Sequence, residues 1–555
     1  MQAGQNPVLV LGAGINGSAI ARELLLNGVS VWLVDTSDLA FGATSGSSRL
    51  IHGGLRYLEY GELDLVKESL GERARLLKLA PQFVRPLRLW IPAASRFGGA
   101  MSAIGRFFGW SWWPQPVPAE GRGVTLIRTG LALYDAYARD PQLPGHEVMP
   151  GAKAPIPIDR HKYRWACAYY DAQVVFPERL VVAMLEDARQ LATFGGLEFR
   201  VFNYHKALLE GKTVEIRPVD NKGVVGEPCV FEPSAIVNAT GAWVDETLQS
   251  LHVPSERLIG GTKGTHAFTF SARLRDALAG QGIYAEARDG RPIFITPLAD
   301  SVLIGTTDDP FKGPPERALA TEPELDYLLA SVNAILPDVH LTRGDVDFHY
   351  CAVRPLPFVH ADQSAAITRR HALIKNDKAS VAMFSVVGGK LTTMRSLAET
   401  ATKTVLQTLG RPHSANSRDR VFPGGEGYPT DVEGAWGQIA ERVGFPVATV
   451  AAVWQLVGTR TEPILQSSPD RALLGQTDLP CSFVRWSIDH EWVRTLADLV
   501  ERRLMLLYDQ RLTKSCLHRL AELLSERGLL SPLQIDDAVA AQTERLATHF
   551  GRHLT

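Results

Sequence analysis

The stretch that decides the fold is PVLVLGAGINGSAIARELLLNGVSVWLVD, residues 7–35. Its opening residues are apolar and strand-like, and a glycine-rich turn separates them from an Ala/Leu-rich run that ends at Asn27-Gly28. A second apolar strand follows and ends at Asp35. The order of strand, glycine turn, helix, strand and acid predicts the first βαβ unit of a dinucleotide-binding domain.

The glycines of this turn have separate tasks. Gly12 makes the tight turn, Gly14 lets the backbone approach a pyrophosphate, and Gly17 lets the helix pack on the strand. The phosphates would lie at the helix N-terminus, where N–H groups and the helix dipole favour anions. Asp35 stands about twenty residues beyond the glycines, where a carboxylate accepts a hydrogen bond from a ribose hydroxyl. This pattern alone does not separate NAD from FAD, and a tight turn that binds nothing is the alternative.

Length and composition narrow the class of protein. A chain of 555 residues exceeds one typical core, so two or three domains are expected. The net charge of −2 argues against a nucleic-acid-binding protein. The five cysteines are scattered, which excludes a zinc ribbon or a disulfide framework and fits a reducing compartment. The sequence has no secretory signal and no apolar run long enough to span a membrane, and no metal site is predicted.

Two further glycine turns argue for FAD. A predicted strand at 235–238 runs into NATGAW at 238–243, and a second predicted strand at 382–387 runs into GGKLTT at 388–393. A two-part cofactor needs contacts from a second strand end at the carboxyl edge of the same sheet. Between residues 38 and 59, small and hydroxylated residues would let the backbone lie close to a flat ligand; a flexible linker is the alternative.

The rest of the chain predicts two more units. From about 256 to 350, strands alternate without long helices between most of them, which predicts an antiparallel sheet in a substrate-binding domain. Residues 411–420 are polar and are interpreted as a linker. From 431 to 555, apolar residues recur with helical spacing. Helices are expected over 433–443, 447–457, 491–508, 513–527 and 532–549.

The segment SSRLIHGGLRYLE, residues 47–59, resembles the signature of FAD-dependent glycerol-3-phosphate dehydrogenases, the aerobic, quinone-reducing family. Further matches follow in the expected order, and the resemblance covers nearly the whole chain. They are NATGAW at 238–243, KGTH at 263–266, IGTTD at 304–308, VRPL at 353–356, GGKLTT at 388–393, FPGG at 422–425 and residues 490–498.

The resemblance implies an α/β fold with three parts. The first is a Rossmann-like FAD-binding domain, built from residues 1–80, 155–255 and 350–410. The second is an antiparallel-sheet substrate-binding or cap domain of the glutathione-reductase/D-amino-acid-oxidase type, built from residues 81–154 and 256–349. The third is a C-terminal α-helical domain, residues 411–555.

The implied activity is oxidation of sn-glycerol 3-phosphate to dihydroxyacetone phosphate, with hydride transfer to FAD and electron transfer to a membrane quinone. Three alternatives stay open: an oxidase that uses oxygen, a dehydrogenase of another polyol phosphate such as erythritol phosphate, and a non-catalytic FAD-binding module. The expected location is cytoplasmic, peripheral on the inner face of the cytoplasmic membrane. No nucleic-acid partner is expected, and a homodimer is left open.

The chemistry assigns roles to a small group of residues. Cations bind a phosphomonoester, and Arg grips it in bidentate fashion, so Arg56, Arg354 and Lys390 are expected to hold the substrate, with Tyr57 adding a hydroxyl contact. His266 is expected to be the base, because a neutral imidazole accepts a proton near pH 7; a core histidine is the alternative. Arg354 is instead suited to hold the alkoxide as it forms. Together with Lys390 these two form the expected catalytic group.

The residues expected to contact FAD come from the glycine turns, the hydroxylated loop and one strand beside the adenine. They are Gly12, Gly14, Asn16, Gly17, Asp35, Thr44, Ser45, Ser48, His52, Gly53, Gly54, Leu55, Val201, Ala239, Thr240, Gly241, Trp243, Gly388, Gly389, Lys390, Leu391 and Thr392.

Residues 93–122 are unusually aromatic. Phe97, Met101, Ile104 and Phe108 recur on one helical face, and Trp110, Trp112 and Trp113 follow, although several glycines weaken the helix. An in-plane membrane helix over 97–113, with tryptophans at headgroup depth, is one interpretation. A helix buried against the protein or a second subunit is the other.

Overall fold

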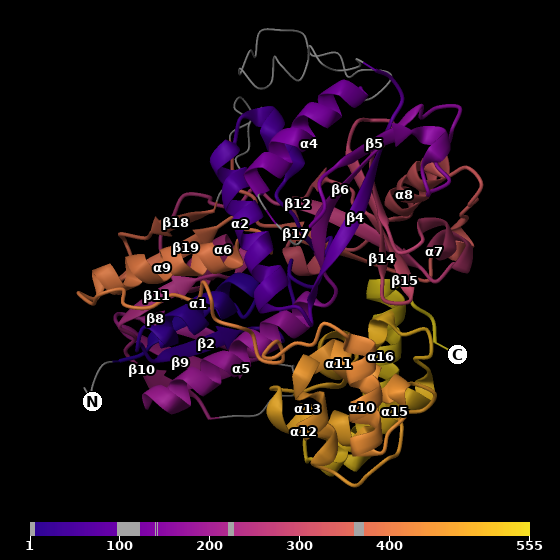
Figure 1. Cartoon of the computed structure of the whole chain (residues 1–555). Helices are drawn as coiled ribbons and strands as arrows, with labels where there is room; N and C mark the ends of the chain where they lie inside the picture. The colour runs from indigo at the N-terminus through magenta and orange to yellow at the C-terminus, as the bar shows by residue number, and fades with distance from the viewer. Residues whose placement is uncertain are drawn as a thin grey trace.

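The computed structural model describes residues 6–96, 123–138, 140, 143–219, 227–359 and 371–554, without the side chains of Arg56, Glu59 and Tyr60. Segment 97–113 therefore lies outside the described residues. Within the described part, two sheets lie side by side and the C-terminal helices, orange to yellow, form a separate cluster below them (Figure 1). This arrangement confirms the predicted α/β fold with a C-terminal helical region.

The first sheet has the order β18-β19-β11-β1-β2-β7. All neighbours pair in parallel except β18 and β19. The parallel pairing aligns the carboxyl ends of the central strands at one edge, and this edge forms the floor of the site described below. The strands are β1 Val8–Leu11, β2 Val31–Asp35, β7 Phe199–Asn203, β11 Ala235–Asn238, β18 Ala372–Lys375 and β19 Met383–Val387.

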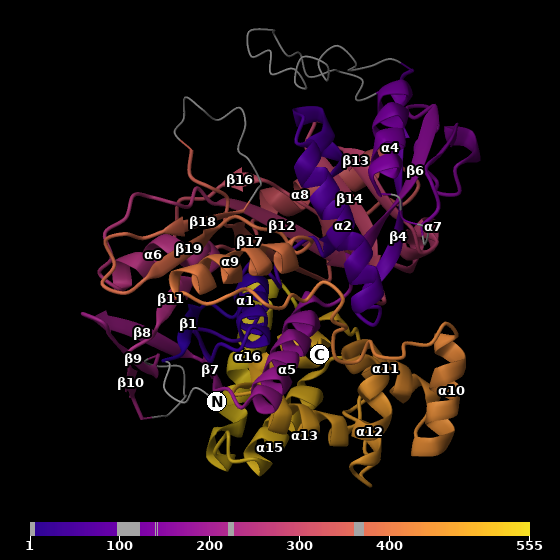
Figure 2. The same cartoon turned by 60° about the vertical axis from the view of Figure 1, so that its left-hand side comes forward.

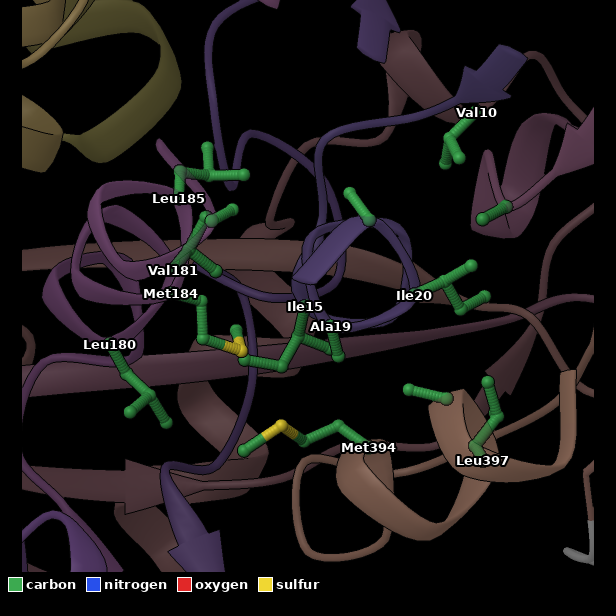
Figure 3. Close-up of a cluster of buried hydrophobic side chains, with 14 of the residues drawn as sticks. Val10, Ile15, Ala19, Ile20, Leu180, Val181, Met184, Leu185, Met394 and Leu397 are labelled. Carbon is green, nitrogen blue, oxygen red and sulfur yellow. The ribbon is translucent and has the colours of Figure 1, made fainter. Parts of the chain in front are cut away.

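Three helices cover one face of this sheet: α1 (Ile15–Leu26), α5 (Pro177–Gly195) and α9 (Met394–Thr408). Figure 3 shows Leu180, Val181 and Met184 of α5 beside Ile15 and Ala19 of α1, with Met394 and Leu397 of α9 nearby. These side chains are buried in one apolar cluster. Helix α6 (Val244–Ser250) and a small sheet pack on the other face. The small sheet holds β8 His205–Glu210, β9 Thr213–Pro218 and β10 Cys229–Phe231.

The second sheet follows the order β16-β12-β15-β14-β13-β4-β6-β3, with β17 beside β12 and β5 beside β6. It is mixed rather than wholly antiparallel, because β13 and β4 pair in parallel. Its strands are β3 Leu50–Ile51, β4 Val84–Ala93, β5 Glu147–Pro150, β6 Trp165–Val174, β12 Thr262–Thr269, β13 Gly282–Glu286, β14 Pro292–Leu298, β15 Ser301–Gly305, β16 Asp309–Pro310 and β17 Phe348–Arg354. Helices α2 (Leu63–Leu79) and α4 (Val124–Ala138) pack on one face, and α7 (Ala272–Leu278) and α8 (Glu322–Ile335) on the other.

The pairing corrects the predicted domain boundaries in two places. Strand β6 was assigned to the FAD-binding part, yet it pairs with β4 along its whole length in the second sheet. Strand β17 was expected to return the chain to the FAD-binding domain from residue 350, yet it pairs with β12 in the second sheet. Both errors have one cause: the sequence shows an apolar strand in each case, and only the tertiary partner decides which sheet it joins.

The C-terminal helices gather below the two sheets, as Figure 2 shows from a second side. Their apolar cluster also includes side chains of the second sheet, among them Phe268 and Phe348. The main helices of this region are α10 Val432–Val443, α11 Val447–Val457, α12 Thr461–Gln466, α13 Cys481–His490, α15 Lys514–Glu526 and α16 Ile535–Phe550. The helix predicted over 491–508 is wrong as one element. It is broken into α14 (Leu496–Asp498), a π-turn (Leu499–Arg503) and a 3₁₀ turn (Leu506–Tyr508), because Trp492 and Met505 adopt φ of 54°.

Candidate active site

A cavity of about 1320 Å³ lies between the carboxyl edge of the first sheet and the second sheet. Its volume exceeds the ~300–1,000 Å³ of an ordinary small-molecule site. The β1–α1 turn, the loop over residues 41–50 and the turns after β11 and β19 all contribute to its wall. Such a cavity is large enough for an extended ligand with two ends.

The β1–α1 turn can be built only from glycine at two positions. Gly12 has φ of +96°, and a Cβ there would lie 2.7 Å from the carbonyl oxygen of Ala239. A Cβ on Gly17 would collide with the carbonyl oxygen of Gly12, so Gly17 lets α1 pack against the turn. Both observations agree with the tasks that the sequence assigned to these glycines.

Asp35 lies at the end of β2 and lines the cavity. Its carboxylate accepts hydrogen bonds from the backbone N–H groups of Ala13 (2.7 Å) and Ser37 (2.8 Å). Burial nevertheless raises the pKa of this carboxyl to about 6. The acid is therefore fixed beside the glycine turn, where an acceptor for a ribose hydroxyl is expected.

Substitution of Gly17 by valine is expected to abolish FAD binding. The new side chain would collide with the Gly12 carbonyl and push α1 away from the phosphate-binding turn. The flavin absorbance of the purified protein measures the effect. Gly437→Ala is the matched control, because that glycine is also helical and a Cβ there meets nothing within 4 Å. Full flavin content in the Gly17 variant would contradict this account of the turn.

The loop over residues 41–50 crosses the cavity from one sheet to the other. At its first half, the Thr44 hydroxyl accepts a hydrogen bond from the backbone N–H of Ile15 (3.0 Å), which joins the loop to the start of α1. At its second half, Ser48 Oγ lies 2.8 Å from His266 Nε2 on β12. The loop therefore links the nucleotide end of the cavity to its opposite end.

His266 lies at that opposite end, buried against the neighbouring strand. A Cβ on Gly305 of β15 would collide with the imidazole, so this glycine provides the space for the ring. Burial, with the positive charges of Arg354 and Arg49, holds the pKa of His266 well below its ordinary value. The ring is therefore neutral near pH 7 and can accept a proton.

Arg354 ends β17 and points into the same region of the cavity. Its guanidinium donates to Asp308 Oδ1 (2.7 Å), to Thr306 Oγ1 (2.9 Å) and to the Thr307 carbonyl (3.1 Å). A Cβ on Gly264 would collide with this guanidinium. The glycines of KGTH and IGTTD thus have a steric reason: they make room for Arg354 and His266.

Lys390 and Tyr57 meet although they are far apart in sequence. The Lys390 ammonium lies 3.8 Å from the centroid of the Tyr57 ring, a cation–π contact. Both residues line the cavity. A Cβ on Gly54 would collide with the Tyr57 ring, which explains the small residue before Leu55. The side chain of Arg56, predicted to bind substrate, lies outside the described part of the chain.

Most of the predicted site residues surround this one cavity. Gly17, Ser45, Gly53 and Val201 do not line it. Gly17 packs inside the turn, Ser45 donates to the carbonyl of Phe41 within its own loop, and the Gly53 N–H donates to the Tyr134 hydroxyl. The predicted residues that line it are Gly12, Gly14, Asn16, Asp35, Thr44, Ser48, His52, Gly54, Leu55, Tyr57, Ala239, Thr240, Gly241, Trp243, His266, Arg354, Gly388, Gly389, Lys390, Leu391 and Thr392.

Several residues of the cavity wall were not predicted. His205 and Lys206 begin β8, one residue after the end of β7. The rule that ligands bind at the carboxyl ends of parallel strands would have found them in place of Val201. Asp308 was not among the predicted site residues, but it pairs with Arg354. Asp171 and Tyr284 come from strands of the second sheet, and nothing in their local sequence marks them as cavity residues.

The residues present fit FAD. The cavity is lined by an acid suited to a ribose, by glycine turns, and by the polar side chains of His266, Arg354 and Lys390. Asn16 lines the cavity, and its buried Oδ1 has no hydrogen-bond partner among the described residues. A polar ligand in the cavity would supply the missing donor. Across the described ranges, no group of three or more metal-ligating side chains gathers. Over the same ranges, no helix is long and apolar enough to cross a membrane.

Comparison with known proteins agrees with this description. Residues 7–394 match the family described as FAD dependent oxidoreductase. The chain is 33% identical over 522 residues to a glycerol-3-phosphate dehydrogenase of Synechocystis sp., covering 89% of this chain and 88% of that protein. It is 31% identical over 505 residues to the D-erythritol 1-phosphate dehydrogenase of Brucella abortus, covering 89% and 93%.

A solved structure supports the fold over almost the whole length. The glycerol-3-phosphate dehydrogenase of Bacillus halodurans, solved in complex with FAD, superposes with a TM-score of 0.72 at 21% identity. The match covers 99% of this chain and 95% of that chain, so it includes the C-terminal helices.

Proposed function

Because this chain belongs to the FAD-dependent oxidoreductase family, we propose that it oxidises sn-glycerol 3-phosphate to dihydroxyacetone phosphate and passes the electrons to a membrane quinone. The observation that carries the proposal is the convergence of His266, Arg354 and Lys390 in one cavity with the glycine turns. A neutral base beside two cations suits the oxidation of an alcohol that carries a phosphate.

The cofactor is FAD, which when bound supplies the two-electron acceptor for the hydride of the alcohol. We assign its pyrophosphate to the β1–α1 turn around Gly12 and Gly14, and its ribose to Asp35. The turn at 388–392 and the loop at His52 would hold the isoalloxazine ring. The hydrogen bond from the His52 N–H to Thr392 Oγ1 (3.1 Å) keeps these two segments together.

The proton of the substrate hydroxyl goes to His266 Nε2, the ring nitrogen that lies 2.8 Å from Ser48 Oγ. Ser48 lines the cavity, so its hydroxyl is placed to stand between substrate and ring. His266 starts the reaction neutral, because its pKa is lowered, and ends it protonated. The C–H bond breaks as hydride, the O–H bond breaks as proton, and a ketone remains.

The cationic side chains are assigned to the phosphate and to the oxygen that becomes negatively charged. Lys390 and Arg56 are assigned to the phosphate, with Tyr57 alongside. Arg354 is assigned either to the phosphate or to the oxygen that gains negative charge as the proton leaves. Its three hydrogen bonds to the segment Thr306–Asp308 fix its direction before substrate arrives, which is the preorganisation that electrostatic catalysis requires.

The identity of the electron acceptor is tested by measuring whether a quinone or oxygen is reduced during turnover. During turnover with glycerol 3-phosphate in air, a soluble quinone analogue is expected to be reduced in a one-to-one ratio with the substrate consumed, with little peroxide. The dehydrogenase names of both curated relatives support this expectation. Peroxide formed in a one-to-one ratio, unchanged by the quinone, would instead identify an oxidase.

A second polyol phosphate is a real alternative substrate. The identities to the glycerol-3-phosphate and D-erythritol 1-phosphate enzymes, 33% and 31%, are too close to separate the two. A phosphate clamp and a base serve both molecules equally. The two substrates differ in the length of the carbon chain that the cavity must hold, so flavin reduction by each of them distinguishes the alternatives.

Access to a membrane quinone requires contact with the bilayer, which we assign to segment 97–113. Deletion of 97–113 is expected to release the enzyme from liposomes while turnover with a soluble dye survives. Leu533→Ser is the matched control: this exposed side chain of the helical region is also apolar, and its loss should leave liposome binding intact. Unchanged binding after the deletion would contradict the assignment.

A further inference from the structure

The loop that carries Ser48 contains a strained arginine. Arg49 is fully buried, and its backbone has φ of 56°, in the left-handed region that side chains other than glycine rarely adopt. Such a conformation persists only where the surroundings impose it. The contacts of the Arg49 side chain therefore decide where Ser48 is held.

The guanidinium donates to the carbonyls of Val175 (2.8 Å) and Ser45 (3.3 Å), and its side-chain partners come from three parts of the chain. Glu178, in the first turn of α5, forms a bidentate ion pair with the guanidinium at 2.6 Å and 3.0 Å. Tyr350 of β17 receives a hydrogen bond from Nε at 3.2 Å. The third partner is Tyr508 of the C-terminal region, whose hydroxyl accepts from Nη2. The C-terminal helical region thus reaches directly into the active-site loop.

Tyr508 is itself held firmly. Its ring packs edge-on against the stacked rings of Phe268 and Phe348 of the second sheet, with centroids 5.7 Å and 5.5 Å away. The turn that bears it is fixed from the end of the chain, since Arg552 donates to the carbonyls of Leu506 and Leu507. The hydroxyl is therefore a fixed acceptor for Arg49 rather than a mobile surface group.

From Arg49 the contacts lead to the base by two short routes. The Tyr350 hydroxyl, which Arg49 holds, donates to the Ser47 carbonyl at 2.6 Å, and Tyr350 is the direct cross-strand neighbour of His266. Ser48, between Ser47 and Arg49, contacts His266 Nε2. Any shift of Arg49 would therefore move both the ring neighbour and the hydroxyl that orients the imidazole.

We propose that Tyr508 is a positioning residue for the reaction: through Arg49 it fixes Ser48, and through Ser48 it fixes His266. The inference rests on the role proposed above for His266. It gives the C-terminal helical region a part in catalysis, although that region contributes no side chain to the cavity wall among the described residues.

The test removes one oxygen atom. Tyr508→Phe keeps the ring packing and deletes one of the acceptors of Arg49, the only one that the C-terminal region supplies among the described residues. We expect a normal flavin content, a KM within about twofold of wild type and a maximal rate of flavin reduction lowered about tenfold, as the loss of one hydrogen bond to a charged group would give. Tyr428→Phe is the matched control, because that C-terminal hydroxyl also accepts a hydrogen bond, from Trp454 Nε1, but lies outside the active site.

Two further measurements separate positioning from a general loss of structure. Amide hydrogen exchange over residues 43–52 should rise in Tyr508→Phe, while exchange in α13 and α15 stays as in wild type. In a double-mutant cycle, Tyr508→Phe should add little to the defect of Ser48→Ala, because both act through one contact. Full additivity, or a changed KM with an unchanged maximal rate, would overturn the proposal.

The exchange measurement needs no substrate, so it also separates this inference from the proposed function. If His266 proves not to be the base but exchange over 43–52 still rises, the Tyr508–Arg49 link stands and only the role of His266 fails. If exchange over 43–52 does not change in Tyr508→Phe, the positioning proposal fails whatever His266 does.

Discussion

Replacement of His266 by alanine is expected to slow reduction of bound FAD by glycerol 3-phosphate by about 10²–10⁴-fold, the usual contribution of a positioned base. FAD content should not change, because the residues assigned to the glycine turns and to Asp35 are untouched. The reason is the loss of the only neutral imidazole that the described structure places beside Ser48 and Arg354 in the cavity. Anaerobic stopped-flow absorbance measures the reduction rate directly.

His349→Ala is the matched control for this experiment. His349 lies on β17 opposite Ala267, is also buried and also has its pKa lowered by burial, to about 4, but it does not line the cavity. Its variant should reduce FAD at close to the wild-type rate. A near-normal rate in His266→Ala itself would remove His266 as the base.

The second large effect is expected for Arg354→Met, which keeps the length of the side chain and removes its charge. Loss of one preorganised donor to a developing oxyanion lowers turnover by about 10²–10³-fold. If Arg354 instead grips the phosphate, KM carries most of the loss. Arg343→Met is the control, because that arginine pairs with the exposed Glu322 outside the cavity.

The same variant has a pH signature with a definite sign. Protonated His266 cannot accept a proton, so activity falls as the pH falls through its pKa. Burial and the charges of Arg354 and Arg49 lower that pKa, so the acid limb of kcat/KM in wild type lies below about 6.5, the ordinary value for histidine. Removal of the Arg354 charge should raise the limb to higher pH. An acid limb of kcat/KM that stays at the wild-type pH or moves to lower pH in Arg354→Met would contradict the effect of the Arg354 charge on the pKa of His266.

The sequence predicts the first sheet well because its signals are local. The β1–α1 turn, Asp35 and the glycine turns after β11 and β19 each combine an apolar strand with residues that only a special backbone needs. Parallel strands then bring their carboxyl ends together, so residues hundreds of positions apart meet at one edge. The family resemblance adds the substrate end, which local signals alone do not specify.

The predictions from sequence fail where a distant part of the chain determines the pairing of a strand or the contact of a side chain. An apolar strand such as β6 has the same sequence pattern whichever sheet it joins, and its partner β4 is distant in sequence. Asp308 looks like a turn residue until Arg354 is placed beside it. Gly17, Ser45 and Gly53 stand in the right motifs but do not line the cavity, because each packs or hydrogen-bonds within the surrounding structure.

The break in the predicted helix at 491–508 has the same origin. Apolar periodicity continues through it, but Asp38 of the first domain forms buried ion pairs with Arg502 and Arg503. Glu491 is paired with Arg179 of α5 in the same way. Buried charges must be paired, so the segment departs from α-helical geometry and presents these groups to the partner domain. Periodicity does not report such partners, and Tyr508 was missed for that reason.

The most direct test of the central claim is anaerobic reduction of the bound flavin by a panel of polyol phosphates, followed by the loss of its visible absorbance. The account predicts that sn-glycerol 3-phosphate bleaches the flavin with the highest second-order rate constant of the panel, that erythritol phosphate is slower, and that glycerol without phosphate is inert. Faster bleaching by erythritol phosphate, or none by any member of the panel, would contradict it.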